Sequence, residues 1–590
     1  QDSQPPTAEI MEAFKNVETA KQGKETAINN ANKYRNENLP KAEAQIEEII
    51  KKALAKAIEK NELPEGEIPA FKVEVPADRT HGDYSTNAAM VSARVFRTAP
   101  MKIAAALCEN AELEGTYFSS VSAAGAGFIN FTLDASYYAD ILLDVEEKGN
   151  MYGHSDMGKG KSALVEFVSA NPTGPMHIGN ARGGAMGDCL AEILAWAGYH
   201  SERGGNQIEK FGLSLDVRYQ QHMGADIEMP EDAYHGQDII DHAAKFAEIH
   251  GDKYMTASQE ERRNALVEYA LPLNIQGLER DLLKYQIKYD TWFKESTLHN
   301  SGEAKKVVDM LTENGYTYEL DGAVWFKAEQ FGCDKDFVLR RSNGFYTYIV
   351  PDIAYHYNKL VTRGFDRAID ILGADHHGYV PRLKAAIQAL GVDPSRIEVI
   401  LMQMVRLVRN GEVVKLSKRS GKAITLVTLL DEVPIDAARF FFNMREANTH
   451  CDFDLDLAVE QSSQNPVYYC QYAHARICSI LAKLKEEGKE ARDCTAEELM
   501  LLKEAEEREL IRYISTLEDV IIGAAKNYDP AKVTHFAVDL ATHFHKFYNN
   551  CRVNVEDESL RQARVTLCIC VRDTMKSILN MLKVEAPERM

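Results

Sequence analysis

The sequence predicts a protein of several domains whose central part is an α/β domain with a parallel sheet. Its 590 residues exceed the usual length of one domain. Strand-like and helix-like segments alternate between about residues 149 and 462, which is typical of a parallel sheet covered by helices. From Asn465 onward the hydrophobic pattern is helical throughout. We therefore expect an α/β domain followed by an all-α domain.

The composition is that of an ordinary globular protein, with 45% hydrophobic and 27% charged residues. No apolar run approaches the roughly 20 residues that span a bilayer, and the polar start shows no secretory signal. Ten cysteines occur without a CxxC pair, so we expect reduced thiols, no metal site and a cytoplasmic location. The net charge of −21 disfavours loose binding to nucleic acid but allows a local basic track.

The first strand–loop–helix unit of the α/β region carries the strongest signal. Val165–Val168 is short, β-branched and apolar, as in a buried strand, and 171–175 is rich in turn residues. A helical pattern follows His177 and continues to about Gly198. The loop therefore meets a helix N-terminus, whose unpaired N–H groups suit phosphate, and Gly179 allows close approach to the backbone. Neither a Walker loop nor a GxGxxG fingerprint is present.

A second such unit spans 368–391. A buried strand ends at Gly373, a polar loop follows over 374–378, and a helix comes next. Ligands of open α/β sheets bind at the carboxyl ends of strands, so Asp375, His376 and His377 are placed to hold a ribose or base. The adjacent histidines also allow a metal site, but no third ligand is near them.

Four further stretches complete this region. Residues 199–206 contain no apolar run, so the strand expected after the first helix is predicted to be missing. Residues 225–335 are helical and charged, as in an insertion between the two halves of the sheet. Tyr346–Val350 is strand-like, and Pro351 suits a first helical turn, which puts Asp352 near a helix start. Residues 413–433 form a basic loop followed by an apolar helix.

Two units precede the α/β region. Residues 45–148 combine helical periodicity over 46–60 and 100–108 with strand patterns over 71–76 and 125–133, which predicts a small α+β module. Residues 1–44 are polar and helix-favouring, so we expect a solvated helical extension. This segment also resembles the tail of stomatin/prohibitin-type (band-7) membrane proteins.

Several motifs carry a family resemblance over about residues 45–590. PMHIGN, with its flanks EFVSANPTGP and ARGGAMGD, resembles the HIGH signature of class I aminoacyl-tRNA synthetases, and of arginyl-tRNA synthetases in particular. KLSKR resembles the KMSKS signature, with Lys418 as its second lysine. HGDYSTN and GFINF resemble the N-terminal additional domain of the family, and the helical C-terminal part resembles a DALR-type anticodon-binding domain. The family has an aromatic and aliphatic strand before GNQI, whereas here Gly205 follows Arg203 almost directly.

The resemblance implies an additional tRNA-binding domain over 45–148, a Rossmann-like catalytic domain over 149–462 and an anticodon-binding domain over 463–590. It implies a ligase that activates L-arginine with ATP and Mg²⁺, and then esterifies the terminal adenosine of tRNA(Arg). We expect a monomer that acts in the cytoplasm. An inactive paralogue that binds tRNA without catalysis is the alternative.

The residues implied for each task are as follows. Catalysis falls to His177, Asn180, Lys415 and Lys418; arginine binding to Asn171, Tyr348, Asp352 and His376; and ATP binding to Gly179, Gly373, Asp375 and His377. Contacts to tRNA are expected from Tyr84, Asn87, Tyr472, Arg476, Tyr548 and Arg552. For the first two of these, turn and cap chemistry is an equal alternative. The remaining aromatic residues stand at helical spacing and are individually more typical of core positions.

Overall fold

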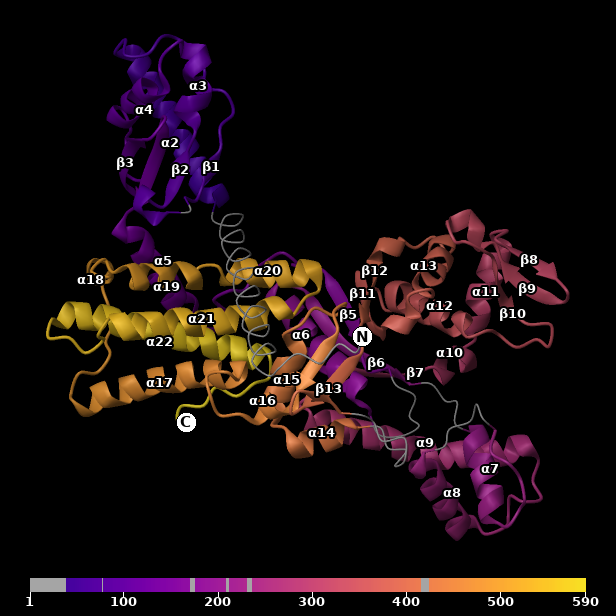
Figure 1. Ribbon diagram of the computed structural model, residues 1–590. Coiled ribbons are helices and arrows are strands. Elements are labelled where there is room, and N and C mark those ends of the chain that lie inside the picture. The colour runs from indigo at the N-terminus through magenta and orange to yellow at the C-terminus, as the bar shows by residue number, and fades with distance from the viewer. Residues whose placement is uncertain (1–38, 77, 170–175, 208–211, 231–235, 415–423) are drawn as a thin grey trace, which may run out of the picture. The chain divides into compact units, whose positions relative to one another are not determined.

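The computed structural model describes residues 39–590 except 77, 170–175, 208–211, 231–235 and 415–423 (Figure 1). The described chain divides into two compact units. The first combines the residues up to Tyr152 with Ile480–Asp519 and His543–Val571. The second combines Gly153–Ser479 with Val520–Thr542 and Arg572–Met590. The expected extension over residues 1–44 lies almost entirely outside the described residues.

The N-terminal part of the first unit is an α+β module. Its antiparallel sheet has the order β1-β2-β4-β3. The strands are β1 (Val73–Glu74), β2 (Tyr84–Thr86), β3 (Phe118–Ala124) and β4 (Phe128–Leu133), and the helices are α2 (Leu39–Glu59), α3 (Ala88–Phe96), α4 (Pro100–Glu109) and α5 (Ala135–Lys148). The sequence predicted this mixture of helices and strands. Asp83 of the module pairs with Arg512 at 2.8 Å, so an ion pair joins it to the helical part of the same unit.

The second unit is built on a five-stranded parallel sheet with the order β12-β11-β5-β6-β7 (Figure 1). The strands are β5 (Ser162–Glu166), β6 (His200–Gln207), β7 (Thr291–Lys294), β11 (Arg367–Gly373) and β12 (Ile397–Met402). Helix α6 (Ile178–Trp196) connects β5 to β6. The chain proceeds from β5 in one direction and places β11 and β12 on the other side. A topological switch point therefore lies between β5 and β11, as in doubly wound α/β folds.

The prediction that no strand follows α6 is wrong, because β6 occupies the sheet between β5 and β7. This strand needs no apolar run because its polar side chains have partners. Arg203 Nε donates to Asp188 at 2.7 Å, and Glu202 accepts hydrogen bonds from Thr291 and Arg363. At Gly205, a Cβ atom would lie 2.6 Å from the Tyr289 ring, so the absence of a side chain lets the strand pack there.

A helical subdomain and a small sheet separate β6 from β11. Helices α7 (Gly212–His222), α8 (Gln237–His250) and α9 (Gln259–Lys284) pack around Leu215, Phe246 and Leu266. The insertion expected over 225–335 is therefore helical only in its first part, because β7 of the parallel sheet and two strands of the small sheet lie in the rest of that range. The next elements are α10 (Ser296–Asn300), α11 (Glu303–Glu313), α12 (Ile349–Tyr357) and α13 (Val380–Ala389), with β8 (Thr317–Leu320), β9 (Ala323–Phe326) and β10 (Phe337–Arg340) in a separate antiparallel sheet. The strand expected over Tyr346–Val350 is reduced to a single antiparallel bridge between Arg340 and Tyr346, because α12 already begins at Ile349.

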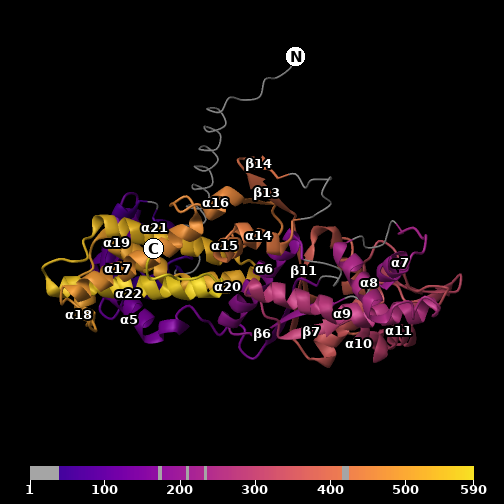
Figure 2. The same cartoon turned by 90° about the horizontal axis from the view of Figure 1, so that it is seen from below.

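The remaining chain returns from the sheet to helices. Beyond β12 come β13 (Val405–Arg409), β14 (Glu412–Val413), β15 (Cys451–Asp454), α14 (Leu426–Glu432), α15 (Ile435–Asn443) and α16 (Leu455–Val459). From Pro466 the described elements are all helices, orange to yellow in Figures 1 and 2: α17 (Pro466–Glu486), α18 (Ala496–Leu499), α19 (Ala505–Ile514), α20 (Leu517–Asn527), α21 (Ala531–Asn550) and α22 (Glu558–Met581). None of the described helices has the length and apolarity that a bilayer crossing requires.

Candidate active site at the carboxyl ends of the parallel strands

Two loops meet at the switch point of the parallel sheet. Strands β5 and β11 are hydrogen-bonded neighbours that run in the same direction, with Glu166 opposite Asp370. The segment that leads to His177 leaves the carboxyl end of β5, and the turn at Ala374–His376 leaves the carboxyl end of β11. Ligands of open α/β sheets bind at this kind of edge. The structure therefore places His177 and Gly373 at the same edge of the parallel sheet.

His177 caps helix α6 with its own ring. Its Nδ1 accepts a hydrogen bond from Gly179 N at 3.2 Å, and Asn180 Oδ1 accepts one from His177 N at 3.2 Å. Burial lowers the pKa of His177 below its ordinary value of 6.5, so the ring is neutral at pH 7. Because Nδ1 is an acceptor, the proton of the neutral ring is on Nε2. His177 thus offers an N–H donor beside the helix N-terminus.

The end of the basic loop is fastened to the residues around His177. Leu426 N donates to Met176 O at 2.7 Å, and Ile178 N donates to Ile424 O at 3.2 Å. Thr425 forms an antiparallel bridge with His177 and caps α14 with its side chain. The segment that follows the two lysines expected to take part in catalysis is therefore bonded directly to the residues at His177. Lys415 and Lys418 themselves, like Asn171, lie outside the described residues.

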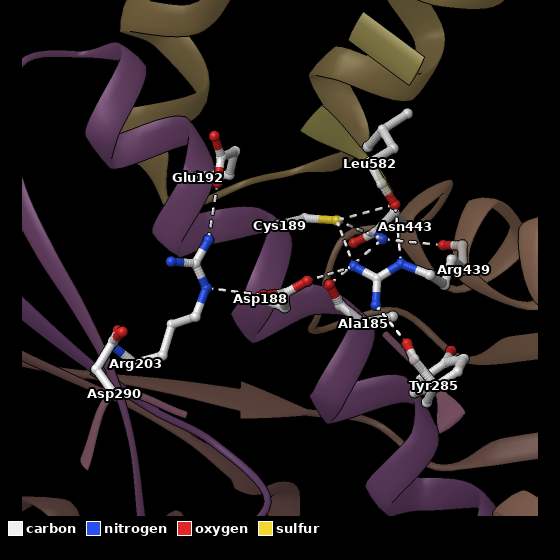
Figure 3. A network of polar contacts seen from close by, with 10 residues as sticks. All are labelled: Ala185, Asp188, Cys189, Glu192, Arg203, Tyr285, Asp290, Arg439, Asn443 and Leu582. Carbon is white, nitrogen blue, oxygen red and sulfur yellow. Dashed lines mark hydrogen bonds and ion pairs between the residues drawn. The ribbon is translucent and has the colours of Figure 1, made fainter. Parts of the chain in front are cut away.

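A buried polar network holds helix α6, with Arg203 and Arg439 on either side of Asp188 (Figure 3). Asp188 accepts hydrogen bonds from Arg203 Nε at 2.7 Å and from Arg439 Nη2 at 2.5 Å. Arg439 is fully buried and also donates to the carbonyls of Leu582 at 2.9 Å and Tyr285 at 3.0 Å. The Asp188 carboxylate thus ties α6 to β6 and α15, and Arg439 extends the network to the chain that follows α22. The network keeps the helix that carries His177 in place.

Arg182 anchors the other side of the same helix without a carboxylate. It is fully buried and donates to the carbonyls of Gln403 at 2.8 Å, Glu446 at 2.9 Å and Thr449 at 3.1 Å. Burial lowers the pKa of the guanidinium. These contacts fix the backbone beyond β12 and beyond α15 relative to α6. In the sequence, Arg182 stood out only as part of the ARGGAMGD segment that follows the HIGH-like motif.

Asp352 lies in the first turn of α12, as the sequence predicted. Its carboxylate accepts a hydrogen bond from the Tyr379 hydroxyl, and burial raises the pKa of this carboxyl above its ordinary value. Tyr348, immediately before α12, has 67% of its surface exposed. An acidic group and an exposed ring thus stand together at one helix N-terminus.

The polar turn after β11 is open to solvent. Asp375, His376 and His377 are all exposed, and His376 Nε2 lies 3.9 Å from the Asp375 carboxylate. At Gly373, a Cβ atom would lie 2.5 Å from Asp375 Oδ1, so a side chain at this position would displace that carboxylate. Among the described residues, no group of three or more His, Cys, Asp or Glu side chains forms a set of metal ligands.

The residues expected to contact tRNA fall into different environments. Tyr84 is 2% exposed and packs edge-to-face against Phe118, so its ring belongs to the core of the module, which neither the tRNA contact nor the turn alternative predicted. Asn87 Oδ1 accepts a hydrogen bond from Lys72 N at 2.9 Å. On α17, Arg476 donates to the Tyr472 hydroxyl at 2.7 Å and lies over that ring. Tyr548 and Arg552 are exposed residues of the other compact unit.

The parallel sheet, its switch point and a histidine-capped helix tied to the end of a basic loop define a class I aminoacyl-tRNA synthetase. Comparison with family models supports this class along the chain. The arginyl-tRNA synthetase N-terminal domain matches residues 44–133, the class I (R) catalytic domain matches residues 144–478, and the DALR anticodon-binding domain matches residues 470–590.

Individual relatives specify the family. An arginine–tRNA ligase of Caldanaerobacter subterraneus subsp. tengcongensis is 51% identical over 556 residues, which cover 93% of this chain and 99% of the relative. One from Acetivibrio thermocellus is 48% identical, covering 92% and 98%. A structure assigned to an arginyl-tRNA synthetase of Campylobacter jejuni has a TM-score of 0.68 and 30% identity, covering 78% of this chain and 100% of that one. This chain belongs to the arginyl-tRNA synthetase family.

Proposed function

We propose that ATP and arginine react at the carboxyl edge of β5 and β11, with His177 at the phosphates and Asp352 at the guanidinium group. The chain is an arginine–tRNA ligase, in line with its identity of about half to relatives of that activity over nearly its whole length. Its substrates are L-arginine, ATP and tRNA(Arg). The inactive paralogue that the sequence left open gains no support from these relatives.

The attachment of the basic loop to His177 carries the assignment of the phosphate site. Attack of the arginine carboxylate on the α-phosphate of ATP spreads negative charge over the phosphate oxygens, which donors and cations stabilise. The Nε2–H of His177 and the amide of Asn180 supply donors. Lys415 and Lys418 supply positive charge from the loop whose end is bonded at Met176 and Ile178.

Gly179, Gly373, Asp375 and His377 complete the ATP site in this proposal. A Cβ atom at position 179 would crowd the His177 ring at 3.1 Å, so glycine preserves the histidine's capping geometry. Mg²⁺ would accompany ATP and neutralise phosphate charge. Because the described residues contain no ready set of metal ligands, phosphates and water would hold it.

Asp352 provides the selectivity for arginine in this proposal. A carboxylate is the group that pairs bidentately with a guanidinium. Asp352 lies in the first turn of α12, and its hydrogen bond from Tyr379 joins it to the segment that follows β11. Tyr348, Asn171 and His376 would line the rest of the amino-acid pocket. After activation, the arginyl group passes to the terminal adenosine of the tRNA.

We assign tRNA contacts to the exposed or half-buried residues Tyr472, Arg476, Tyr548, Arg552 and Asn87, but not to Tyr84, whose ring is buried. Stacked rings beside an arginine suit unpaired bases. We further propose that the enzyme is a cytoplasmic monomer. The resemblance of residues 1–44 to a band-7 tail stays a hypothesis, since the family models begin at residue 44.

The test is arginine-dependent ATP–pyrophosphate exchange with tRNA(Arg) present. Loss of two charge-assisted hydrogen bonds is worth about 3 to 6 kcal/mol, so Asp352→Asn is expected to lower kcat/KM for arginine by about two to four orders of magnitude. The KM for ATP should not change. The matched control is Asp452→Asn, which removes an exposed carboxylate paired with Arg406. Normal arginine use by Asp352→Asn would refute the pocket.

A further inference from the structure

A buried cluster of four ionisable side chains lies behind Asp352. Lys359 Nζ contacts Glu166 Oε2 at 2.5 Å and Asp370 Oδ1 at 2.7 Å, and His356 Nε2 lies 2.5 Å from Asp370 Oδ2. The four residues come from the end of β5, from α12, from the π-helical turn Asn358–Thr362 and from β11. Lys359 is fully buried and the other three are nearly so. The family motifs in the sequence did not point to this cluster.

The contacts of His356 determine its charge. Its Nδ1 lies 2.8 Å from the Asp352 carbonyl oxygen, and its Nε2 faces the Asp370 carboxylate. Both partners are acceptors, so both ring nitrogens donate, and only the imidazolium can do that. The cluster then contains two cations, Lys359 and His356, and two anions, Glu166 and Asp370. It is neutral in itself, as buried charges must nearly be.

Asp352 is joined to this neutral cluster but is not one of its ion pairs. His356 holds the main-chain carbonyl of Asp352. The carboxylate of Asp352 receives a hydrogen bond from the uncharged Tyr379 hydroxyl. Tyr379 stands at the start of α13, where its carbonyl accepts from Leu383 N at 3.2 Å and its N–H donates to His376 O at 2.9 Å. The backbone of Asp352 and its side chain are thus fixed by two different elements.

We propose that Tyr379 is a positioning residue for arginine selection: its hydroxyl aims the Asp352 carboxylate, while the cluster behind it supplies both cations with anions of their own. Asp352 thereby keeps a negative charge that a substrate guanidinium neutralises. This inference rests on the proposed role of Asp352 and adds a residue that does not itself touch arginine. A neutral donor suits the task because a cation at position 379 would compete with the substrate.

The groups around Asp352 predict how removal of the Tyr379 hydroxyl changes the pKa of the Asp352 carboxyl. The ionisable groups that act on this carboxyl are Tyr379 from α13, His356 from α12, Lys359 from the π-helical turn and Glu166 from β5. Asp370 and Glu295 act on Tyr379 in turn. Burial raises the pKa of Asp352, whereas the Tyr379 hydrogen bond opposes that rise. Removing the hydroxyl therefore raises the pKa of Asp352 further, and the carboxylate becomes neutral at a higher pH.

The experiment is Tyr379→Phe in the full chain, assayed by arginine-dependent ATP–pyrophosphate exchange with tRNA(Arg) at a series of pH values. We expect the KM for arginine to rise about tenfold or more, which is the effect of one hydrogen bond to a charged group, with little change in the KM for ATP. The acid limb of kcat/KM for arginine should move to higher pH. A merely structural role would not move that limb.

The control is Tyr219→Phe, which removes a hydroxyl that donates to Gly251 O at 2.7 Å in the helical insertion. It should leave both KM values and the acid limb unchanged. The KM for ATP and thermal unfolding report whether Tyr379→Phe is folded. If Tyr379→Phe unfolds, Tyr379→His, which restores a ring donor and adds a titratable charge, should fold and show an arginine KM that changes with pH.

Asp352→Asn separates the two proposals. If Asp352→Asn loses arginine use while Tyr379→Phe keeps the wild-type KM and acid limb, the positioning role is wrong and the pocket stands. If Asp352→Asn and Tyr379→Phe both use arginine normally, the pocket itself is wrong.

Discussion

The buried network around Asp188 allows a sharp prediction about stability. The side chain of Asp188 is only 3% exposed and pairs with Arg203 and Arg439. In Asp188→Asn, one amide oxygen remains as an acceptor, while the amide N–H₂ group faces an arginine donor. Arg439 is then a fully buried cation without its carboxylate. Removal of one partner from a buried ion pair costs about 3 to 5 kcal/mol.

This loss of unfolding free energy can be measured by urea titration of the second compact unit. With a slope near the upper end of the usual range, about 3 kcal/mol per M, this loss moves the urea midpoint down by roughly 1 to 2 M. Tryptophan fluorescence follows that unit, because Trp196, Trp292 and Trp325 all belong to it. Because a chain with two units need not unfold in one step, the midpoint of this transition is the quantity to compare.

The matched control is Asp452→Asn, the same substitution at a carboxylate that pairs with Arg406 at 2.7 and 2.9 Å. The side chains of Arg406 and Asp452 are about half exposed, at 53% and 51%. Exposed pairs contribute about 0 to 1 kcal/mol, so its midpoint should move by roughly 0.3 M at most. Equal shifts for the two variants would refute the reasoning, because burial is what distinguishes them.

Two further predictions concern helix α6. Gly187→Ala places a Cβ atom 2.2 Å from the Phe167 ring, whereas the Cβ of Gly183→Ala would lie 3.5 Å from Met402, an ordinary contact distance. Gly187→Ala should therefore lower the free energy of unfolding by about 1 to 3 kcal/mol, measured by thermal unfolding, and Gly183→Ala should not lower it. His177 has its pKa lowered in the native state, so the unfolded chain binds more protons below pH 6.5, and stability is lost as pH falls through that window. His177→Gln should lose less stability than wild type between pH 7.5 and 5.5, and an identical loss would contradict a lowered pKa of His177 in the native state.

The sequence predicted those parts of the fold that have a periodic hydrophobic pattern or are bounded by turn residues. Strand β5 and helix α6 follow the expected strand, turn residues and helical period, and α12 puts Asp352 in its first turn. Strand β6 was missed because its residues are polar or glycine. Its strand character depends on partners from distant parts of the chain, such as Asp188 and Tyr289, which no local pattern shows.

The candidate site also contains features that the sequence indicated and features that it did not. The sequence predicted a helix that begins after His177, and the structure adds that the ring of His177 itself caps this helix. The cluster behind Asp352 was missed, although one signal was present: Glu166 and Asp370 are carboxylates within otherwise apolar strands. Sequence cannot say whether such a residue faces a buried lysine. Tyr84 is the opposite case, in which a motif suggested a functional residue and the structure shows a buried one: its ring is 2% exposed.

The hydrogen bond from Arg439 to the Leu582 carbonyl has a consequence for how the molecule is made. Ribosomes synthesise chains from the N-terminus, so the acceptor of this bond exists only after almost the entire chain has been produced. Until then Arg439 lacks one of the carbonyls that satisfy its buried charge. A nascent chain cut short before this point cannot complete the support of the histidine-bearing helix. Assembly of the reaction centre is thereby tied to the end of translation, the process that this enzyme supplies with arginine.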